Sequence, residues 1–320
     1  MAIEHALAHA RTKPWGIVDL RPWSSVRHDG AIGEIWYDRP GRTPVEPSLL
    51  FKLLFTSQPL SIQVHPNDAD AHSIGLANGK TEAWYILSAG PDAKIALGLN
   101  RRLSPQQLRD AINDGTIADL AQWRGVLPDD TIFVPAGTIH AIGAGLVIAE
   151  IQQRSDTTYR LFDYGRQREL HVERAIEVAD AGPSVCQDIP QKLTDSRTLL
   201  VSNAHFVFER IELPQHSAWR MEAEQETWLL VIDGEARVGS YDLAIGDAIF
   251  AQSECADIQV GPNGMVGLVA YTGGTSDPRL LRRAKQVGAA HAETRQDMQM
   301  PSLLSEATAI PIGHPLETIK

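Results

Sequence analysis

Four side chains of this sequence could together bind a metal ion. They are Gln63 and His65 in LSIQVHPND, Glu82 in GKTEAWYIL and His140 in FVPAGTIHAIG. Imidazole nitrogens with carboxylate and amide oxygens suit Zn²⁺ or another divalent transition ion when one coordination position stays open for substrate. The set therefore predicts a metal-dependent enzyme.

The spacing of the first two residues predicts the element that positions them. Side chains two positions apart on a strand project from the same face. Gln63 and His65 would then point together into a barrel, while Ile62 and Val64 face the other way. One strand can supply two ligands in this manner.

The other two candidates belong to separate strands. Glu82 begins an apolar run after the polar, loop-like stretch 67–81, and His140 follows the run 131–134 and the turn at 135–137. A single histidine in an apolar strand is more often a hydrogen-bonded core residue than a ligand. The prediction consequently depends on the combination of four residues on three strands.

The elements around these residues are mostly short strands, separated by Gly, Pro and Asp. This pattern predicts a mainly β chain, a sandwich or barrel, with a helical insertion near 104–125. In the insertion, Ser104 is a good N-cap, Pro105 suits the first helical position, and Leu108 and Ile112 recur at helical spacing. The helical insertion could either cover the metal site or lie on the surface as a helical hairpin, and the sequence leaves both alternatives open. The strand candidates lie near residues 31–37, 59–65, 82–89, 94–99, 131–135, 139–143 and 146–153.

A second β-rich segment follows a polar connector at 187–197. In this segment the run 227–238 is predicted to form a hairpin, and 243–250 a turn that enters a strand. The segment has no His-x-His or Gln-x-His pair, so we expect a metal-free barrel. The predicted organisation is a metal-binding barrel at 1–182, a second barrel at 183–274 and a tail at 275–320, with one helix at 280–295.

Composition narrows the class of protein. With 320 residues the chain is long enough for two barrels, and its net charge of −11 argues against general nucleic-acid binding. No apolar run reaches the length of a membrane span, and the first residues lack a signal-peptide pattern. Two cysteines, Cys186 and Cys255, are too few for a disulfide framework. A cytoplasmic protein without membrane partners is expected, of undetermined oligomeric state.

Several strings of the sequence resemble a known family. LFTSQPLSIQVHP, GKTEAWYIL, VPAGTIHAIGAG and EIQQRSDTTYRLFDYGR are similar, in this order, to the type I mannose-6-phosphate isomerases in their short bacterial form, which belong to the cupin superfamily. The likeness is clear over about the first 175 residues and continues as a general barrel likeness to about residue 272. It implies two cupin-like jelly-roll barrels and interconversion of mannose 6-phosphate and fructose 6-phosphate.

The resemblance also implies roles for residues. Its motifs place zinc on Gln63, His65, Glu82 and His140, in agreement with the spacing argument. They further place the essential arginine of the family at Arg160 and a catalytic lysine at Lys80, with a sugar phosphate as substrate.

The implied reaction explains why cations are needed. An aldose–ketose interconversion moves a proton between C1 and C2 through a cis-enediol whose oxygens gain negative charge. A divalent ion and a fixed guanidinium stabilise that charge without a redox cofactor. Arg160 lies in the apolar stretch 159–164, where an unpaired guanidinium would be expensive, whereas Lys80 could equally be a salt-bridged or solvated charge.

Further residues could contact the substrate, although the sequence does not decide among them. Lys52, Arg154 and Arg166 are candidates for binding the phosphate. Glu34 and Trp36 resemble the GE-x-W segment near the sugar site of the family, although a strand with a buried tryptophan explains them equally well.

His72 is expected at the surface, and Asp163 could orient Arg160 or Arg166. The alternatives to the isomerase are a non-catalytic sugar-binding or regulatory cupin, a cupin isomerase for another sugar phosphate, and an Fe²⁺ oxygenase. The oxygenase would favour a more histidine-rich ligand set.

Overall fold

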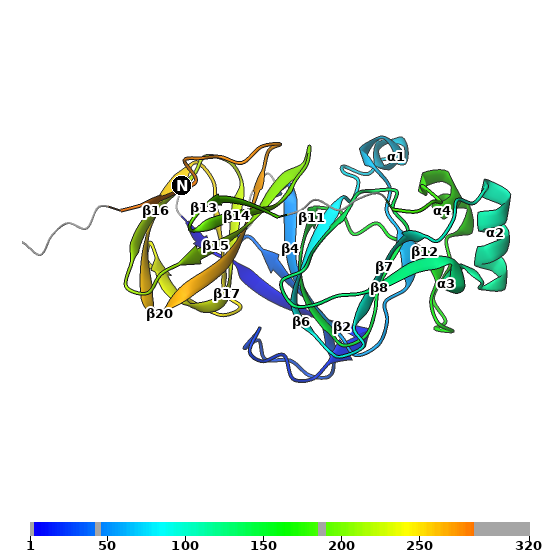
Figure 1. The fold of residues 1–320 in the computed structure, drawn as a ribbon, viewed down its shortest axis with the longest axis horizontal. Helices are drawn as coiled ribbons and strands as arrows, with labels where there is room; N and C mark the ends of the chain where they lie inside the picture. The colour runs from blue at the N-terminus through cyan, green and yellow to red at the C-terminus, as the bar shows by residue number, and fades with distance from the viewer. Residues whose placement is uncertain (1–2, 42–45, 185–189, 285–320) are drawn as a thin grey trace, which may run out of the picture. The chain divides into compact units, whose positions relative to one another are not determined.

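The computed structural model describes residues 3–41, 46–184 and 190–284 (Figure 1). Strands dominate these residues, and they form three antiparallel sheets of six, five and ten strands. The predicted mainly β fold is therefore confirmed.

The central strands of the six-stranded sheet are buried on both faces. The strand order is β2 (Leu7–Ile17), β3 (Ile32–Asp38), β4 (Leu49–Thr56), β11 (Leu146–Gln153), β6 (Glu82–Ala89) and β9 (Thr131–Val134). Side chains such as Leu54, Trp84 and Ile148 pack on one face, and Phe51 and Ile151 pack on the other. Every residue of β4 is buried, which is why this strand reads LLFKLLFT without the alternation of a half-exposed strand.

The five-stranded sheet carries the predicted ligand strand in its interior. Its order is β12 (Tyr159–Phe162), β5 (Ile62–Val64), β10 (His140–Ile142), β7 (Lys94–Leu99) and β8 (Ala121–Gly125). Ile62 and Val64 of β5 pack in an apolar cluster with Leu108 and Ile112 of the helical insertion.

The helices support the outer face of this sheet. They are α2 (Pro105–Asp114), α3 (Ile117–Leu120) and α4 (Val172–Val178), which gather beside β7, β8 and β12 (Figure 1). Ser104 caps α2, as the sequence predicted, and it forms a capping box with Gln107. The predicted insertion is helical only to residue 120, because 121–125 pair with β7 as strand β8.

Two helices were not predicted, α4 and a further helix, α1. α1 (Asp68–Ser73) lies in the polar stretch that the sequence presented as a loop, and Asn67 caps it. Helices of six residues are too short for a periodic apolar pattern to identify them.

The ten-stranded sheet contains the second β-rich segment. Its strands are β1 (Glu4–His5), β13 (Gln191–Thr194), β14 (Arg197–Ser202), β15 (Phe206–Leu213), β16 (Ala218–Ala223), β17 (Thr227–Val238), β18 (Tyr241–Ala244), β19 (Ala248–Ala251), β20 (Glu254–Thr272) and β21 (Leu281–Arg283). Residues 243–250 form the predicted turn into a strand.

Two expectations for this segment were wrong. Residues 227–238 form the single strand β17, with register shifts near Gly234, rather than a hairpin. The described start of the predicted helix at 280–295 is strand β21, which pairs with β16. The remainder of that helix, most of the tail and Cys186 lie outside the described residues, and the predicted barrel boundaries at 182 and 274 stay predictions.

The second segment packs against the six-stranded sheet. Phe51 and Phe208 meet edge to face with ring centroids 6.1 Å apart, and Trp228 belongs to the same core. The buried Glu226 carboxylate accepts hydrogen bonds from the backbone N–H groups of Ser48 and Leu49, at 2.6 and 2.9 Å. The start of β4 is thereby held by the second segment.

Among the described residues, no helix is long and apolar enough to cross a membrane.

Candidate metal centre

Three of the predicted site residues lie side by side on the five-stranded sheet. Arg160 of β12 is directly opposite Gln63 of β5, and Gln63 is directly opposite His140 of β10. Cross-strand neighbours present their side chains to the same face of a sheet. The sheet thus places a guanidinium, an amide and an imidazole in one row.

His65, Glu82 and His140 form a compact cluster. One ligand atom from each can be chosen so that all lie within 4.8 Å of one another, and each residue is buried. The Nε2 atoms of His65 and His140 lie 3.5 and 3.4 Å from the two Glu82 carboxylate oxygens. Among the described residues this is the group of His, Cys, Asp and Glu side chains that could hold a metal ion.

Gln63 adjoins the cluster. Its Nε2 lies 3.3 Å from His140 Nε2, and its Oε1 accepts a hydrogen bond of 3.0 Å from the Ser61 hydroxyl. Rotating the amide by 180° would present the oxygen to the cluster, and Ser61 could then accept from the nitrogen. The structure therefore brings together all four residues predicted as ligands.

Backbone carbonyl groups fix both imidazole rings. The Nδ1 of His65 lies 2.8 Å from the Thr157 oxygen, and the Nδ1 of His140 lies 2.9 Å from the Thr138 oxygen. A proton on Nδ1 donates to the carbonyl and leaves Nε2 as an unprotonated donor atom for a metal. Burial lowers the pKa of His65 well below its usual value and that of His140 to about 4, so both rings are neutral at pH 7.

Glu82 supplies the negative charge of the cluster. Burial raises the pKa of its carboxyl to about 7, and Lys80 opposes this shift. Its Oε1 is buried without a hydrogen-bond partner, and Oε2 contacts the Lys80 ammonium. A buried carboxylate oxygen left unsatisfied is costly, and a bound cation would satisfy it. Together with neutral imidazoles this donor set fits a divalent transition metal.

Lys80 is held in its ammonium form. Burial by itself would lower its pKa, but the carboxylates of Glu82 and Glu150 raise the pKa overall. Its Nζ also lies 3.0 Å from His65 Nε2.

Gln63 and Lys80, which contact the cluster, line a polar cavity of about 200 Å³ between residues of the six-stranded and five-stranded sheets, whereas His65, Glu82 and His140 are not among its lining residues. Gln63, Lys80 and Arg160 reach it from the predicted site. The other lining residues are Lys13, Trp15, Glu34, Lys52, Leu54, Leu60, Ser61, Ile142, Glu150, Asp156, Thr158, Arg168 and His171.

Arg160 enters the cavity with unused hydrogen-bonding capacity. Its Nε is buried without a partner, and its Nη1 makes only a long 3.5 Å contact to the Glu169 carbonyl. Its pKa is lowered by burial and then by the neighbouring Arg168. The site thus contains a guanidinium that can donate to a bound anion.

The sequence did not single out Glu150, although it lines the cavity. Glu150 accepts a hydrogen bond of 3.0 Å from Trp84 Nε1 and lies 3.4 Å from Lys52 Nζ. Its pKa is lowered by the cations Lys80 and Lys52, which outweigh burial. The available signal was a single carboxylate in the otherwise apolar run LVIAEI.

Of the three phosphate candidates, one lines the cavity. Lys52 is buried and donates to Gln152 Oε1 at 2.6 Å. Arg154 is paired with Asp38, and Arg166 donates to Asp163 and to a backbone carbonyl. Neither arginine is among the lining residues.

The remaining candidates divide between cavity and surface. Glu34 lines the cavity and accepts a 2.8 Å hydrogen bond from Trp36 Nε1. Asp163 pairs with Arg166, as one prediction had it, rather than with Arg160. His72 is exposed, as expected.

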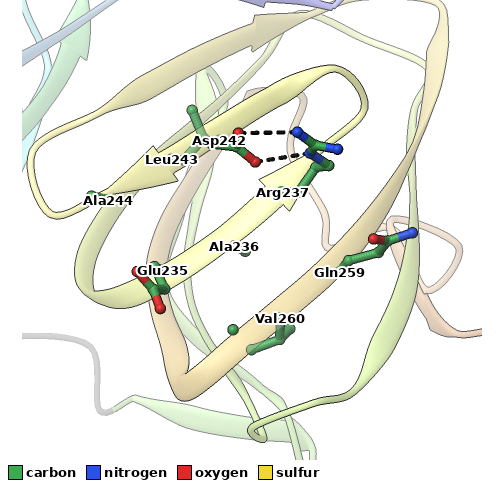
Figure 2. A pocket seen from close by; sticks show the side chains of 9 residues that line it. Glu235, Ala236, Arg237, Asp242, Leu243, Ala244, Gln259 and Val260 are labelled. Carbon is green, nitrogen blue, oxygen red and sulfur yellow. Dashed lines mark hydrogen bonds and ion pairs between the residues drawn. The ribbon is translucent and has the colours of Figure 1, made fainter.

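A larger hollow lies in the ten-stranded sheet, with a volume of about 500 Å³. Figure 2 shows Arg237 of β17 turned toward Asp242 of β18, and the two side chains form paired hydrogen bonds of 2.8 and 3.0 Å. The charges of that pair satisfy each other. Among the described residues, the smaller cavity is therefore the better candidate for a reactive site, because Arg160 at its wall has a buried nitrogen without a partner.

Comparison with known proteins finds that the chain is similar to mannose-6-phosphate isomerases. It is 40% identical over 207 residues to mannose-6-phosphate isomerase ManA of Bacillus subtilis (strain 168), covering 59% of this chain and 63% of that protein. It is 43% identical over 140 residues to mannose-6-phosphate isomerase of Streptococcus mutans, covering 42% of this chain and 44% of that protein. The chain thus matches between 44% and 63% of the length of these curated relatives. No protein-family model matches the chain.

Solved structures agree in fold. The crystal structure of mannose 6-phosphate isomerase from Bacillus subtilis has a TM-score of 0.73 and 25% identity, covering 85% of this chain and all of that chain. A variant of phosphomannose isomerase from Salmonella typhimurium, at 14% identity and a TM-score of 0.67, shares the fold alone. These matches confirm the resemblance predicted from the motifs.

Proposed function

We propose that this chain, which is similar in sequence and fold to mannose-6-phosphate isomerases, interconverts mannose 6-phosphate and fructose 6-phosphate with Zn²⁺ as cofactor. The observation that carries the proposal is the buried His65, Glu82 and His140 cluster beside a cavity that Arg160 enters with an unpartnered nitrogen. A metal site and a fixed cation beside one small polar cavity can stabilise the negative charge that develops on the oxygens of an enediol.

In the proposed reaction Gln63, His65, Glu82 and His140 would hold the ion. When bound, a divalent ion supplies Lewis acidity at a substrate oxygen. The carbonyl partners of both imidazoles keep Nε2 unprotonated, so the site is ready for a metal without losing a proton from either histidine.

Arg160 and Lys80 act on the substrate. Proton transfer between C1 and C2 creates negative charge on the adjacent oxygens, and Arg160, a half-buried residue whose Nε is buried, can donate hydrogen bonds to them. Lys80 remains protonated beside the cluster and offers a second cation to the same oxygens. The cavity walls, which include Leu54, Leu60 and Ile142, exclude bulk water from one side of the sugar.

A coupled assay tests the proposal. Purified protein is assayed for conversion of mannose 6-phosphate to fructose 6-phosphate before chelation, after chelation and after return of Zn²⁺, with metal content measured at each stage. The expected result is turnover that chelation removes and zinc restores. A folded, zinc-loaded protein with no turnover on any hexose 6-phosphate would refute the isomerase and favour a sugar-binding cupin.

A further inference from the structure

The segment that carries Lys80 and Glu82 is held by contacts outside the cavity. The backbone N–H of Lys80 donates to the Pro66 carbonyl at 2.9 Å. A Cβ atom on Gly79 would lie 2.5 Å from the carbonyl carbon of Asn67, so the two backbones are in direct contact there. The residues that enter β6 therefore pack against the turn that follows β5.

The carboxylate of Asp68, the first residue of α1, joins this segment to the end of β11. Its Oδ1 accepts hydrogen bonds from the Gly79 backbone N–H at 2.7 Å and from Gln153 Nε2 at 2.8 Å. Burial raises the pKa of Asp68, but these hydrogen bonds and two nearby histidines lower it overall, so the carboxylate is charged at pH 7. Hydrogen bonds to an ionised acceptor are stronger than those between neutral groups.

Gln153 links Asp68 to Thr81, which lies between the two site residues of the segment. Gln153 Oε1 accepts from the Thr81 backbone N–H at 3.0 Å, and the Gln153 backbone N–H donates to the Thr81 carbonyl at 3.1 Å. A backbone N–H only donates and an ionised carboxylate only accepts, so a single orientation of the Gln153 amide satisfies both partners. Gln153 is 5% exposed, which keeps water from replacing these bonds.

We infer that Asp68 and Gln153 are positioning residues that determine where Lys80 and Glu82 lie in the site. Neither is among the residues that line the cavity, so they act through the backbone of residues 79–82. This inference rests on the proposed function, in which Glu82 would hold the ion and Lys80 acts on the substrate.

The site tolerates little displacement of this segment. Lys80 Nζ lies 3.0 Å from His65 Nε2, and the Glu82 oxygens lie 3.4 and 3.5 Å from the nearest imidazole nitrogens. Distances between a metal and its ligands vary by only about 0.2 Å, and a displacement of about 1 Å at a reacting group can slow a reaction about 100-fold. Loss of the Asp68 carboxylate should therefore weaken metal binding and slow turnover.

The second β-rich segment also contacts Asp68. His205 Nδ1 lies 3.8 Å from Asp68 Oδ2, and the two side chains are 31% and 40% exposed. Exposed ion pairs contribute little. The positioning consequently depends on the hydrogen bonds of Oδ1, and His205→Ala is a control for the loss of this charge pair.

Hydrogen exchange tests the link without metal or turnover. In Asp68→Ala the amides of Gly79 and Thr81 should both exchange at least tenfold faster than in wild type, because Gln153 loses its anchor, while amides of β17 keep their rates. Asp68→Asn retains an oxygen acceptor and should restore most of the protection. Gln153→Leu should accelerate exchange at Thr81 more than at Gly79. An unchanged rate at Thr81 in Asp68→Ala would overturn the inference.

Titration with Co²⁺ measures the effect on the metal site. In Asp68→Ala the dissociation constant of Co²⁺ should rise about tenfold, and its visible absorption should shift because Glu82 is displaced. A loss of stability alone would lower Tm but leave the spectrum of the folded, loaded protein unchanged. Asp68→Asn should return to within threefold of wild type. His205→Ala and Asp70→Asn, which also remove charge beside the first turn of α1, should match the wild type.

The kinetics of the same variants separate this inference from the proposed function. In Asp68→Ala, kcat for mannose 6-phosphate should fall at least tenfold while KM changes less than threefold. An active wild type whose Asp68→Ala variant has the same Co²⁺ affinity, spectrum and kcat would overturn the positioning role alone. If the wild type is inactive on every hexose 6-phosphate but its Co²⁺ binding depends on Asp68, the positioning role stands and the isomerase is refuted.

Discussion

If zinc binds at the cluster as proposed, replacement of His140 by alanine should remove most of the stabilisation that the ion gives to the fold. His140 is fully buried, and its Nδ1 is anchored on the Thr138 carbonyl, so Nε2 has a fixed position in the cluster. A ligand that binds only the folded state stabilises it by RT ln(1 + [L]/Kd).

The expected loss of stabilisation can be calculated from the zinc concentration and from the weaker binding when one of four ligands is missing. With free zinc at about 1,000 times Kd, the wild type gains about 4 kcal/mol. Loss of one of four ligands should weaken binding by about 100-fold, the upper range for loss of an outer-shell partner. At the same zinc concentration the variant then gains about 1.4 kcal/mol. At about 2 °C per kcal/mol for a chain of this size, zinc should raise Tm by about 8 °C in the wild type and about 3 °C in the variant.

The assay is thermal unfolding with chelator and with buffered zinc, near pH 7.5. The pKa of His140 is about 4 and that of Glu82 about 7, so few protons compete with the metal under these conditions. Alanine also leaves a cavity, but its cost is present with and without zinc and cancels in the difference. His72→Ala is the control, because His72 is exposed and outside the cluster. An equal zinc-induced shift in His140→Ala and wild type would refute the ligand assignment.

Two further outcomes concern the same cavity. Arg160→Ala should reduce kcat by a factor of about 10² to 10³, which is the usual cost of losing one oxyanion donor. The zinc content and the Tm of this variant should remain those of the wild type. An unchanged kcat in the coupled assay would show that Arg160 takes no part in the reaction. Zinc affinity should fall as the pH drops below about 7, because the raised pKa of Glu82 means that a proton must then leave before the metal binds. Competition with a chromophoric chelator between pH 8 and 5.5 measures this effect, and a constant affinity over that range would contradict it.

The candidate ligands could be predicted from the sequence because strand alternation and short apolar runs, which are local patterns, determine which way these side chains point. Alternation along β5 places Gln63 in the cavity, while Ile62 and Val64 pack in the apolar cluster with the helices. Short apolar runs bounded by Gly and Pro likewise predicted the strands that hold Glu82 and His140.

Other parts of the site depend on contacts that are distant in the chain. Lys52 is opposite Glu150 only because β4 pairs with β11, and no local pattern specifies that register. β4 is buried on both faces, so it lacks the alternation that would have marked it as a strand. His171 reaches Arg160 because the chain folds back after β12, over a stretch of mixed polarity.

The row formed by Arg160, Gln63 and His140 also bears on which changes of chain length the protein tolerates. Strand side chains alternate, so inserting or deleting one residue within β5 would disrupt the common orientation in which Gln63 and, just after the strand, His65 point to the metal cluster. The helices on the outer face of the same sheet contribute no residue to the cavity lining. Homologous chains should therefore vary in length around residues 104–120 while keeping the count of residues in β5, β10 and β12 unchanged.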